Sequence, residues 1–136
     1  TEESIPFDKP TLQHLAKLVE EGENCKFTLL ETVVVDEDHI VRVNQQYLDR
    51  DYVTDIISFR YDEEQENNQN IEGTLYCCWP RIREQAQEFG ETPDREFRRI
   101  VIHGMLHLSG YEDQSSGQKT NMTEKENLYL SRFESE

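Results

Sequence analysis

Two histidines near the C-terminal end of the sequence have the spacing of a metal-binding pair. The segment 103–113 reads HGMLHLSGYED, with His103 and His107 four residues apart. Residues four apart on a helix share one face, with Cβ atoms roughly 5–6 Å apart, so both imidazoles can reach one ion. A His-x-x-x-His spacing taken alone is more typical of two hydrogen-bonded histidines in a buried helix than of a metal site. A third ligand nearby would favour the metal.

Asp113 can supply that ligand only if the chain turns back, because it follows His107 by six residues. Gly110 stands between them, and glycine adopts the left-handed conformation that ends helices at little steric cost. Three protein ligands and a water make a catalytic arrangement, whereas four protein ligands close a structural zinc site. The sequence therefore predicts an open metal site formed by His103, His107 and Asp113.

The residue after the first histidine limits which classes of metal-dependent enzyme the site fits. Zinc peptidases place a glutamate there as general base, but this chain has Gly104, which cannot transfer protons. Peptide hydrolysis by that route is disfavoured, although a peptidase of divergent mechanism stays open. Two histidines and a carboxylate also occur in non-haem iron oxygenases, for which a helical pair is unusual.

Apolar spacing and turn residues predict the elements that position this segment. Helices are expected over 11–21, ending at Gly22, from Asp36 or Asp38 to about 50, over 80–89, from Pro93 through the histidines, and over 123–133. Strands are expected over 27–35, 55–61 and 71–79, with a polar acidic loop over 62–70.

The strands should form a mixed sheet. The second and third, joined by the acidic loop, are expected to be antiparallel, while the first and its following helix begin a β-α-β crossover. Thr92 as N-cap and Pro93 at the first helical position predict where the histidine helix begins. The apolar stretch 100–108 of this helix should pack through the middle of the molecule. Thr123 and Glu126 are spaced as a capping box for the last helix.

Length and composition indicate a soluble, single-domain protein. The 136 residues, 35% hydrophobic and 32% charged, are expected to form one domain over 1–136, and no apolar run reaches the ~20 residues of a membrane span. The acidic N-terminal end resembles no secretion signal. Three cysteines, with Cys77 and Cys78 adjacent and facing opposite sides of a strand, favour a reducing, cytoplasmic location without a membrane partner.

The net charge of −15 opposes binding to a polyanion. Five arginines that flank the histidine segment could offset it locally: Arg81, Arg83, Arg95, Arg98 and Arg99. The alternative is an ordinary solvated surface in which they pair with four glutamates, Glu84, Glu88, Glu91 and Glu96.

With these residues in view, the chain resembles the YbeY family of bacterial ribosomal-RNA maturation endoribonucleases. The family signature, His-Gly-x-Leu-His-Leu-x-Gly-Tyr-Asp-His, stands here as HGMLHLSGYED. The resemblance extends to NQQY at 44–47, TDIISF at 54–59, Gly73, Gln85-Ala86, Met122 and Glu126. It covers most of the chain from about Val33 onward.

The resemblance implies an α+β fold, a small mixed sheet packed with about five helices and the metal-site helix in the centre. It implies one zinc ion at the base of a cleft, with His103 and His107 as ligands and Asp113 in place of the family's third histidine. The implied activity is a metal-dependent, single-strand-preferring endoribonuclease in small-subunit ribosomal RNA maturation and ribosome quality control. Metal-activated water would attack a phosphodiester, or the metal would polarise it.

Implied partners are single-stranded RNA, small-subunit ribosomal RNA or a ribosomal particle, and a ribosome-associated protein.

Other departures from the family pattern concern substrate binding. Leu48 replaces an arginine, Val53 and Arg60 replace prolines, and Thr74 replaces an acidic residue. Four residues are candidates for the substrate cleft: Arg50, Thr54, Asp55 and Ser58. No general acid is identifiable. The alternative function is a non-catalytic ribosome-assembly factor with a structural metal site.

Overall fold

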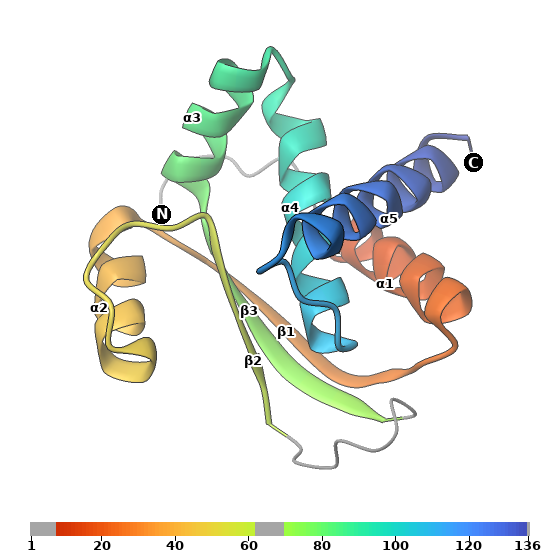
Figure 1. The fold of residues 1–136 in the computed structure, drawn as a ribbon, viewed down its shortest axis with the longest axis horizontal. Coiled ribbons are helices and arrows are strands. Elements are labelled where there is room, and N and C mark those ends of the chain that lie inside the picture. The colour runs from red at the N-terminus through yellow and green to blue at the C-terminus, as the bar shows by residue number, and fades with distance from the viewer. Residues whose placement is uncertain (1–7, 62–69, 136) are drawn as a thin grey trace.

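The computed structural model describes residues 8–61 and 70–135 and contains, in those ranges, five helices and three strands (Figure 1). In chain order the elements are α1 Lys9–Glu23, β1 Phe27–Val35, α2 Glu37–Leu48, β2 Ile56–Arg60, β3 Ile71–Cys78, α3 Trp79–Phe89, α4 Pro93–Leu108 and α5 Ser116–Glu134. Residues 62–69 of the predicted acidic loop lie outside the described ranges.

The three strands form a mixed sheet in the order β1-β3-β2. β1 runs parallel to β3, with Thr32 opposite Leu75, and β2 runs antiparallel to β3, with Ser58 opposite the same Leu75. The predicted mixed sheet is thus confirmed. In the chain, α2 and β2 come between β1 and β3. In the sheet, β3 lies in the centre, next to both β1 and β2.

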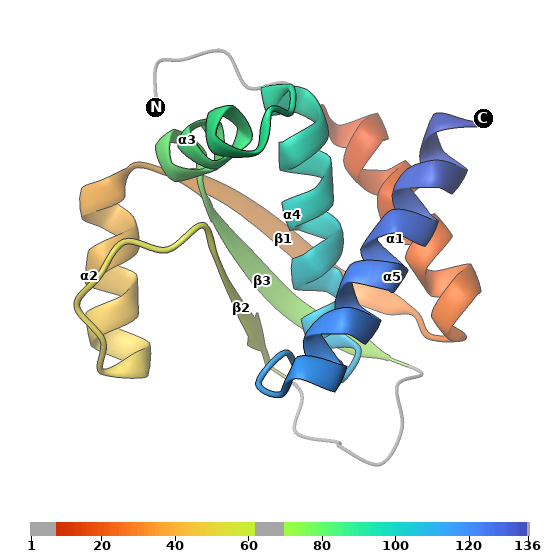
Figure 2. The same cartoon turned by 45° about the horizontal axis from the view of Figure 1, so that its top comes forward.

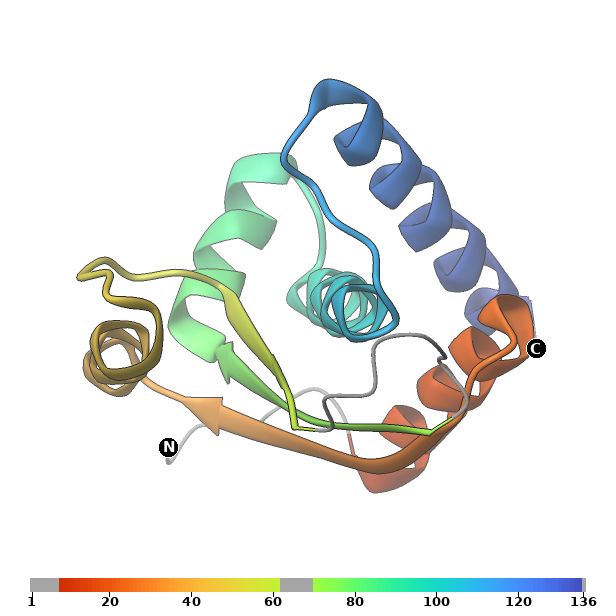
Figure 3. The same ribbon diagram turned by 60° about the horizontal axis from the view of Figure 1, so that its bottom comes forward.

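Helix α4 lies in the centre of the molecule, as predicted. Seen end-on in Figure 3, it is surrounded by the sheet, α3, α1 and α5. α1 and α5 lie side by side next to it (Figure 2). Ile102, Met105 and Leu106 of α4 are fully buried in a core shared with Leu75 and Cys77 of the sheet.

Helix α2 covers part of the opposite face of the sheet. Its Ile40 and Val43 pack with Val35, Ile57 and Cys78 in a second, smaller core. Cys78 therefore lies on the other face from its neighbour Cys77, as the strand alternation predicted. The result is the expected α+β fold. No helix in the described ranges is long and apolar enough to cross a membrane.

The predicted start of α4 is confirmed in detail. The Thr92 hydroxyl accepts a hydrogen bond from the Arg95 amide at 3.2 Å, and Pro93 occupies the first turn. This arrangement satisfies an otherwise unpaired amide at the helix N-terminus and presets the backbone of the first helical residue.

Two predicted helix ends are wrong. α5 begins at Ser116, not at Thr123, and its capping box is formed by Ser115 and Gln118. The first turns of α5 carry no apolar periodicity, so the pattern that marks a helix is absent there. α1 runs to Glu23 rather than ending at Gly22, and Asn24 caps it in the left-handed conformation.

Candidate metal centre

The two histidine rings converge above α4. His103 and His107 have ring centroids 4.6 Å apart and planes inclined by 77°, and their Nε2 atoms are 3.1 Å apart. Both side chains are partly accessible, at 22% and 29% exposure. One helical turn therefore places two ring nitrogens at one point that solvent can reach.

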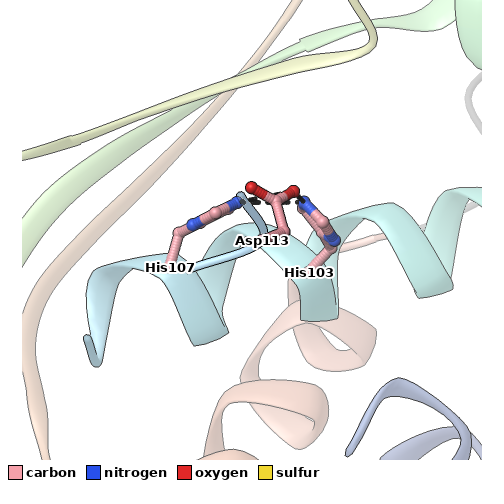
Figure 4. Close-up of side chains that lie close together, drawn as sticks. All are labelled: His103, His107 and Asp113. Atoms are coloured by element: carbon pink, nitrogen blue, oxygen red, sulfur yellow. Dashed lines mark hydrogen bonds and ion pairs between the residues drawn. The ribbon is translucent and has the colours of Figure 1, made fainter. Parts of the chain in front are cut away.

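The turn after α4 returns the third predicted ligand to this point. Gly110 has φ +115°, and the amide of Tyr111 donates to the carbonyl of Leu106 at 3.0 Å, which folds the chain back. The Asp113 Oδ2 atom then lies 3.5 Å from the Nε2 atoms of both His103 and His107 (Figure 4).

The spacing of the three ligand atoms suits a tetrahedral ion. All three lie within 4.8 Å of one another. Zinc–nitrogen bonds of 2.0–2.1 Å with tetrahedral angles place neighbouring ligand atoms about 3.3–3.4 Å apart. The observed 3.1 Å and 3.5 Å bracket that value. One ion fits with only small side-chain movement, and a fourth position stays available for water or substrate.

Hydrogen bonds on the far side of each ring direct Nε2 toward this point. The Nδ1 atom of His107 lies 2.9 Å from the carbonyl oxygen of Tyr111, which can only accept, so Nδ1 carries the hydrogen. Whenever the His107 ring is neutral, this hydrogen on Nδ1 leaves the lone pair on Nε2. Two such lone pairs facing each other at 3.1 Å repel unless a proton or a cation lies between them.

His103 meets a buried carboxylate instead of a carbonyl. Its Nδ1 atom lies 2.6 Å from Oε2 of Glu126, a residue that is only 7% exposed. Burial lowers the pKa of His103, but the hydrogen bond to Glu126 and the charges of Glu126, Asp55 and Asp113 together outweigh it, so the pKa is raised. A proton therefore competes with a metal at His103, and metal binding should strengthen as the pH rises.

The histidines and Asp113 lie in the wall of a cleft of about 610 Å³. All four predicted cleft residues line it: Arg50, Thr54, Asp55 and Ser58. Gln85 fixes Asp55 by donating to its carboxylate at 3.1 Å. Ser58 instead directs its hydroxyl toward the carbonyl of Gly104, at 3.5 Å.

The loop after α2 that carries Arg50 is anchored by one buried side chain. Asn44, 1% exposed, donates from Nδ2 to the carbonyl of Tyr52 at 2.9 Å. The backbone carbonyl of Asn44 accepts from the Arg50 amide at 3.2 Å. Arg50 and Tyr52 thus sit on a fixed rim of the cleft.

Sequence reasoning missed both groups that orient the histidine rings. The spacing of Glu126 from Thr123 suggests only a capping box, and the Tyr111 carbonyl carries no signal in residue type. The helical spacing of Met122, Tyr129 and Leu130 could have revealed Glu126 as an inward-facing residue. These three residues and Glu126 form the buried face of α5. A carboxylate on the apolar face of a helix needs a partner.

The comparisons with known proteins agree with this architecture. A family model described as "Endoribonuclease YbeY" matches residues 3–134. A protein of that name from Chloroherpeton thalassium is 38% identical over 128 residues, covering 94% of this chain and 86% of its own. Another from Salinibacter ruber is 37% identical over 132 residues, covering 93% and 84%. The solution structure of TM1509 from Thermotoga maritima is similar with a TM-score of 0.58 and 29% identity, covering 93% of this chain and 85% of that one.

Proposed function

The chain belongs to the endoribonuclease YbeY family, a family of RNA-cleaving hydrolases, and on that premise we propose that it is a zinc-dependent endoribonuclease that prefers single strands. Its substrate is small-subunit ribosomal RNA, cut during maturation and ribosome quality control in the cytoplasm. Residues 1–136 act as one unit, which works on free RNA or on a ribosomal particle with an associated protein.

The observation that carries this proposal is the convergence of His103, His107 and Asp113 at the wall of an open cleft. These three residues would hold one zinc ion. A divalent ion at such a site polarises a phosphodiester and activates water for its hydrolysis. Glu126 and the Tyr111 carbonyl hold the two imidazoles in the orientation that ligation needs.

The residues of the cleft wall favour single-stranded RNA as the substrate. RNA is recognised specifically mostly in single strands, whose unstacked bases can enter a cleft that a duplex cannot. Arg50 on the rim and Arg60 on β2 are the arginines among the described cleft residues, and a guanidinium suits a phosphate. We assign Arg50, Thr54, Asp55 and Ser58 to substrate contact.

The test compares zinc-loaded wild type with two histidine variants on single-stranded RNA. We expect His107→Ala to lose cleavage, because it removes a ligand. The matched control is His39→Ala, an exposed histidine on α2, which should cleave like wild type. Equal cleavage by wild type and His107→Ala would assign the activity to a contaminant and contradict the proposal.

The second candidate is a non-catalytic assembly factor whose ion only holds the turn 103–113. The acidic chain favours it, with a net charge of −15. It predicts binding to small-subunit particles without metal-dependent turnover. Particle binding that persists in His107→Ala, with no cleavage by wild type, would favour this candidate.

A further inference from the structure

An ion pair between a buried carboxylate and a partly buried arginine lies directly behind one of the two histidines. The Glu126 side chain, 9% exposed, uses its two oxygens for different partners. Oε2 meets Nδ1 of His103 at 2.6 Å, and Oε1 accepts from Nη1 of Arg99 at 3.3 Å. Glu126 belongs to α5, whereas His103 and Arg99 belong to α4, one turn apart.

The environments of the two histidines differ in charge. His107 is oriented by a neutral backbone carbonyl, and His103 is oriented by a carboxylate that carries its own cation. A buried carboxylate without a cation is costly, and removing one partner of such a pair leaves the other uncompensated. Arg99 therefore keeps the Glu126 carboxylate in place against His103.

We propose that Arg99 and Glu126 form a positioning pair that aims the Nε2 atom of His103 at the metal position. This inference rests on the proposed function, because it concerns the same site. Partners behind a ligating histidine fix its tautomer and ring orientation, and their loss typically weakens metal affinity 10–100-fold. Neither residue contacts the metal position itself.

The pair also joins α5 to α4, so the test must separate orientation from stability. Four variants are compared with wild type: Glu126→Ala, Glu126→Gln, Arg99→Met and the control Glu124→Gln, which changes an exposed carboxylate of the same helix. Three quantities are measured: the Kd of Zn²⁺ by chelator competition, the ring tautomers of both histidines by ¹⁵N NMR with zinc present, and the thermal unfolding of metal-free protein.

We expect Glu126→Ala to weaken zinc binding about 10–100-fold and to change the tautomer signal of His103. The signal of His107, the internal control, should stay. Glu126→Gln keeps an accepting oxygen without the charge and should fall between wild type and Glu126→Ala. Arg99→Met should weaken zinc binding in the same direction, and Glu124→Gln should bind like wild type.

Unchanged zinc affinity and an unchanged His103 signal in Glu126→Ala would overturn the positioning role, even if metal-free stability falls. The proposed function fails differently. In one outcome, wild type binds zinc but cleaves no RNA, while Glu126→Ala still binds zinc more weakly than wild type. That result would refute the nuclease function and support the positioning pair. Wild type that binds no zinc would overturn both.

Discussion

Asp113 would set the charge of the proposed metal centre. As a ligand it would supply an anionic oxygen beside two neutral imidazoles, and its Oδ2 atom lies 3.5 Å from the Nε2 atoms of both histidines. An anionic ligand lowers the net positive charge that acidifies water on a divalent ion. This chain should therefore form its nucleophile at a higher pH than a three-histidine site would.

Replacing Asp113 tests that effect. We expect Asp113→Asn to weaken zinc binding by on the order of 100-fold or more, since loss of an outer partner alone costs 10–100-fold. Asp113→His should keep zinc and move the rising limb of the pH–rate profile to lower pH. The control is Glu112→Gln, which removes a neighbouring exposed charge of the same turn. Equal zinc affinities for Asp113→Asn and Glu112→Gln would show that Asp113 is not a ligand.

Residue types and spacing sufficed to predict the three ligand candidates, because a helical repeat and one turn relate them. The orienting groups could not be predicted in this way. Glu126 follows His103 by 23 residues and reaches it only because α5 packs against α4. The Tyr111 group is a backbone carbonyl, whose position depends on the turn and not on the side chain.

At the scale of elements, the closeness of α4 to the sheet depends on Gly104. A Cβ atom at this position would lie 2.6 Å from Cδ1 of Ile56 and 2.8 Å from Cδ2 of Leu75. Gly104 therefore allows close packing of helix and sheet.

Gly104→Ala should destabilise the protein. The added methyl group overpacks a buried contact at a cost of about 1–3 kcal/mol, against a gain of about 1 kcal/mol in helix propensity. Gly117→Ala in α5 is the matched control, because nothing lies within 4 Å of the point that its Cβ atom would occupy and only the propensity gain applies. Urea unfolding should show a loss for the first variant and a small gain for the second. A gain in both would mean that α4 can shift away from the sheet.

Helices and strands were predictable where apolar residues repeat with a clear period. β1 has the predicted bounds 27–35, and α3 and β3 differ from theirs by one residue. The start of α5 was not predictable, because residues 116–121 are polar or glycine and its packing begins only at Met122. The strand order also required the structure, since the crossover joins β1 to β3 and not to β2.

For the whole molecule, three of the five arginines of α3 and α4 are paired with carboxylates and so do not offer a free basic rim. Arg81 pairs with Glu84 and Glu88, and Arg95 pairs with Glu91 and Glu134. These contacts fit the solvated surface that the sequence left open as an alternative. Of the predicted partners, Glu96 differs: it is 2% exposed and accepts from Gln85 at 3.4 Å, and its burial raises its pKa.

RNA binding should therefore depend only weakly on salt. Each phosphate contact made by a cation contributes about −0.7 to the slope of log K against log salt for single strands. The described cleft wall has two arginines and three carboxylates, so we expect a slope no steeper than about −1.4. The repulsion between RNA and a chain of net charge −15, which salt screens, should make the slope shallower still.

The measurement is fluorescence anisotropy of labelled single-stranded RNA with the non-cleaving His107→Ala protein between low and moderate KCl. Arg50→Gln should weaken binding and flatten the slope by about 0.7, because it removes one of the two cleft cations. The matched control Arg81→Gln removes an arginine that is already paired with glutamates and should leave the slope unchanged. A slope several times steeper than about −1.4, reduced by Arg81→Gln, would mean that RNA breaks these ion pairs and binds the α3 surface. The substrate path would then extend well beyond the cleft.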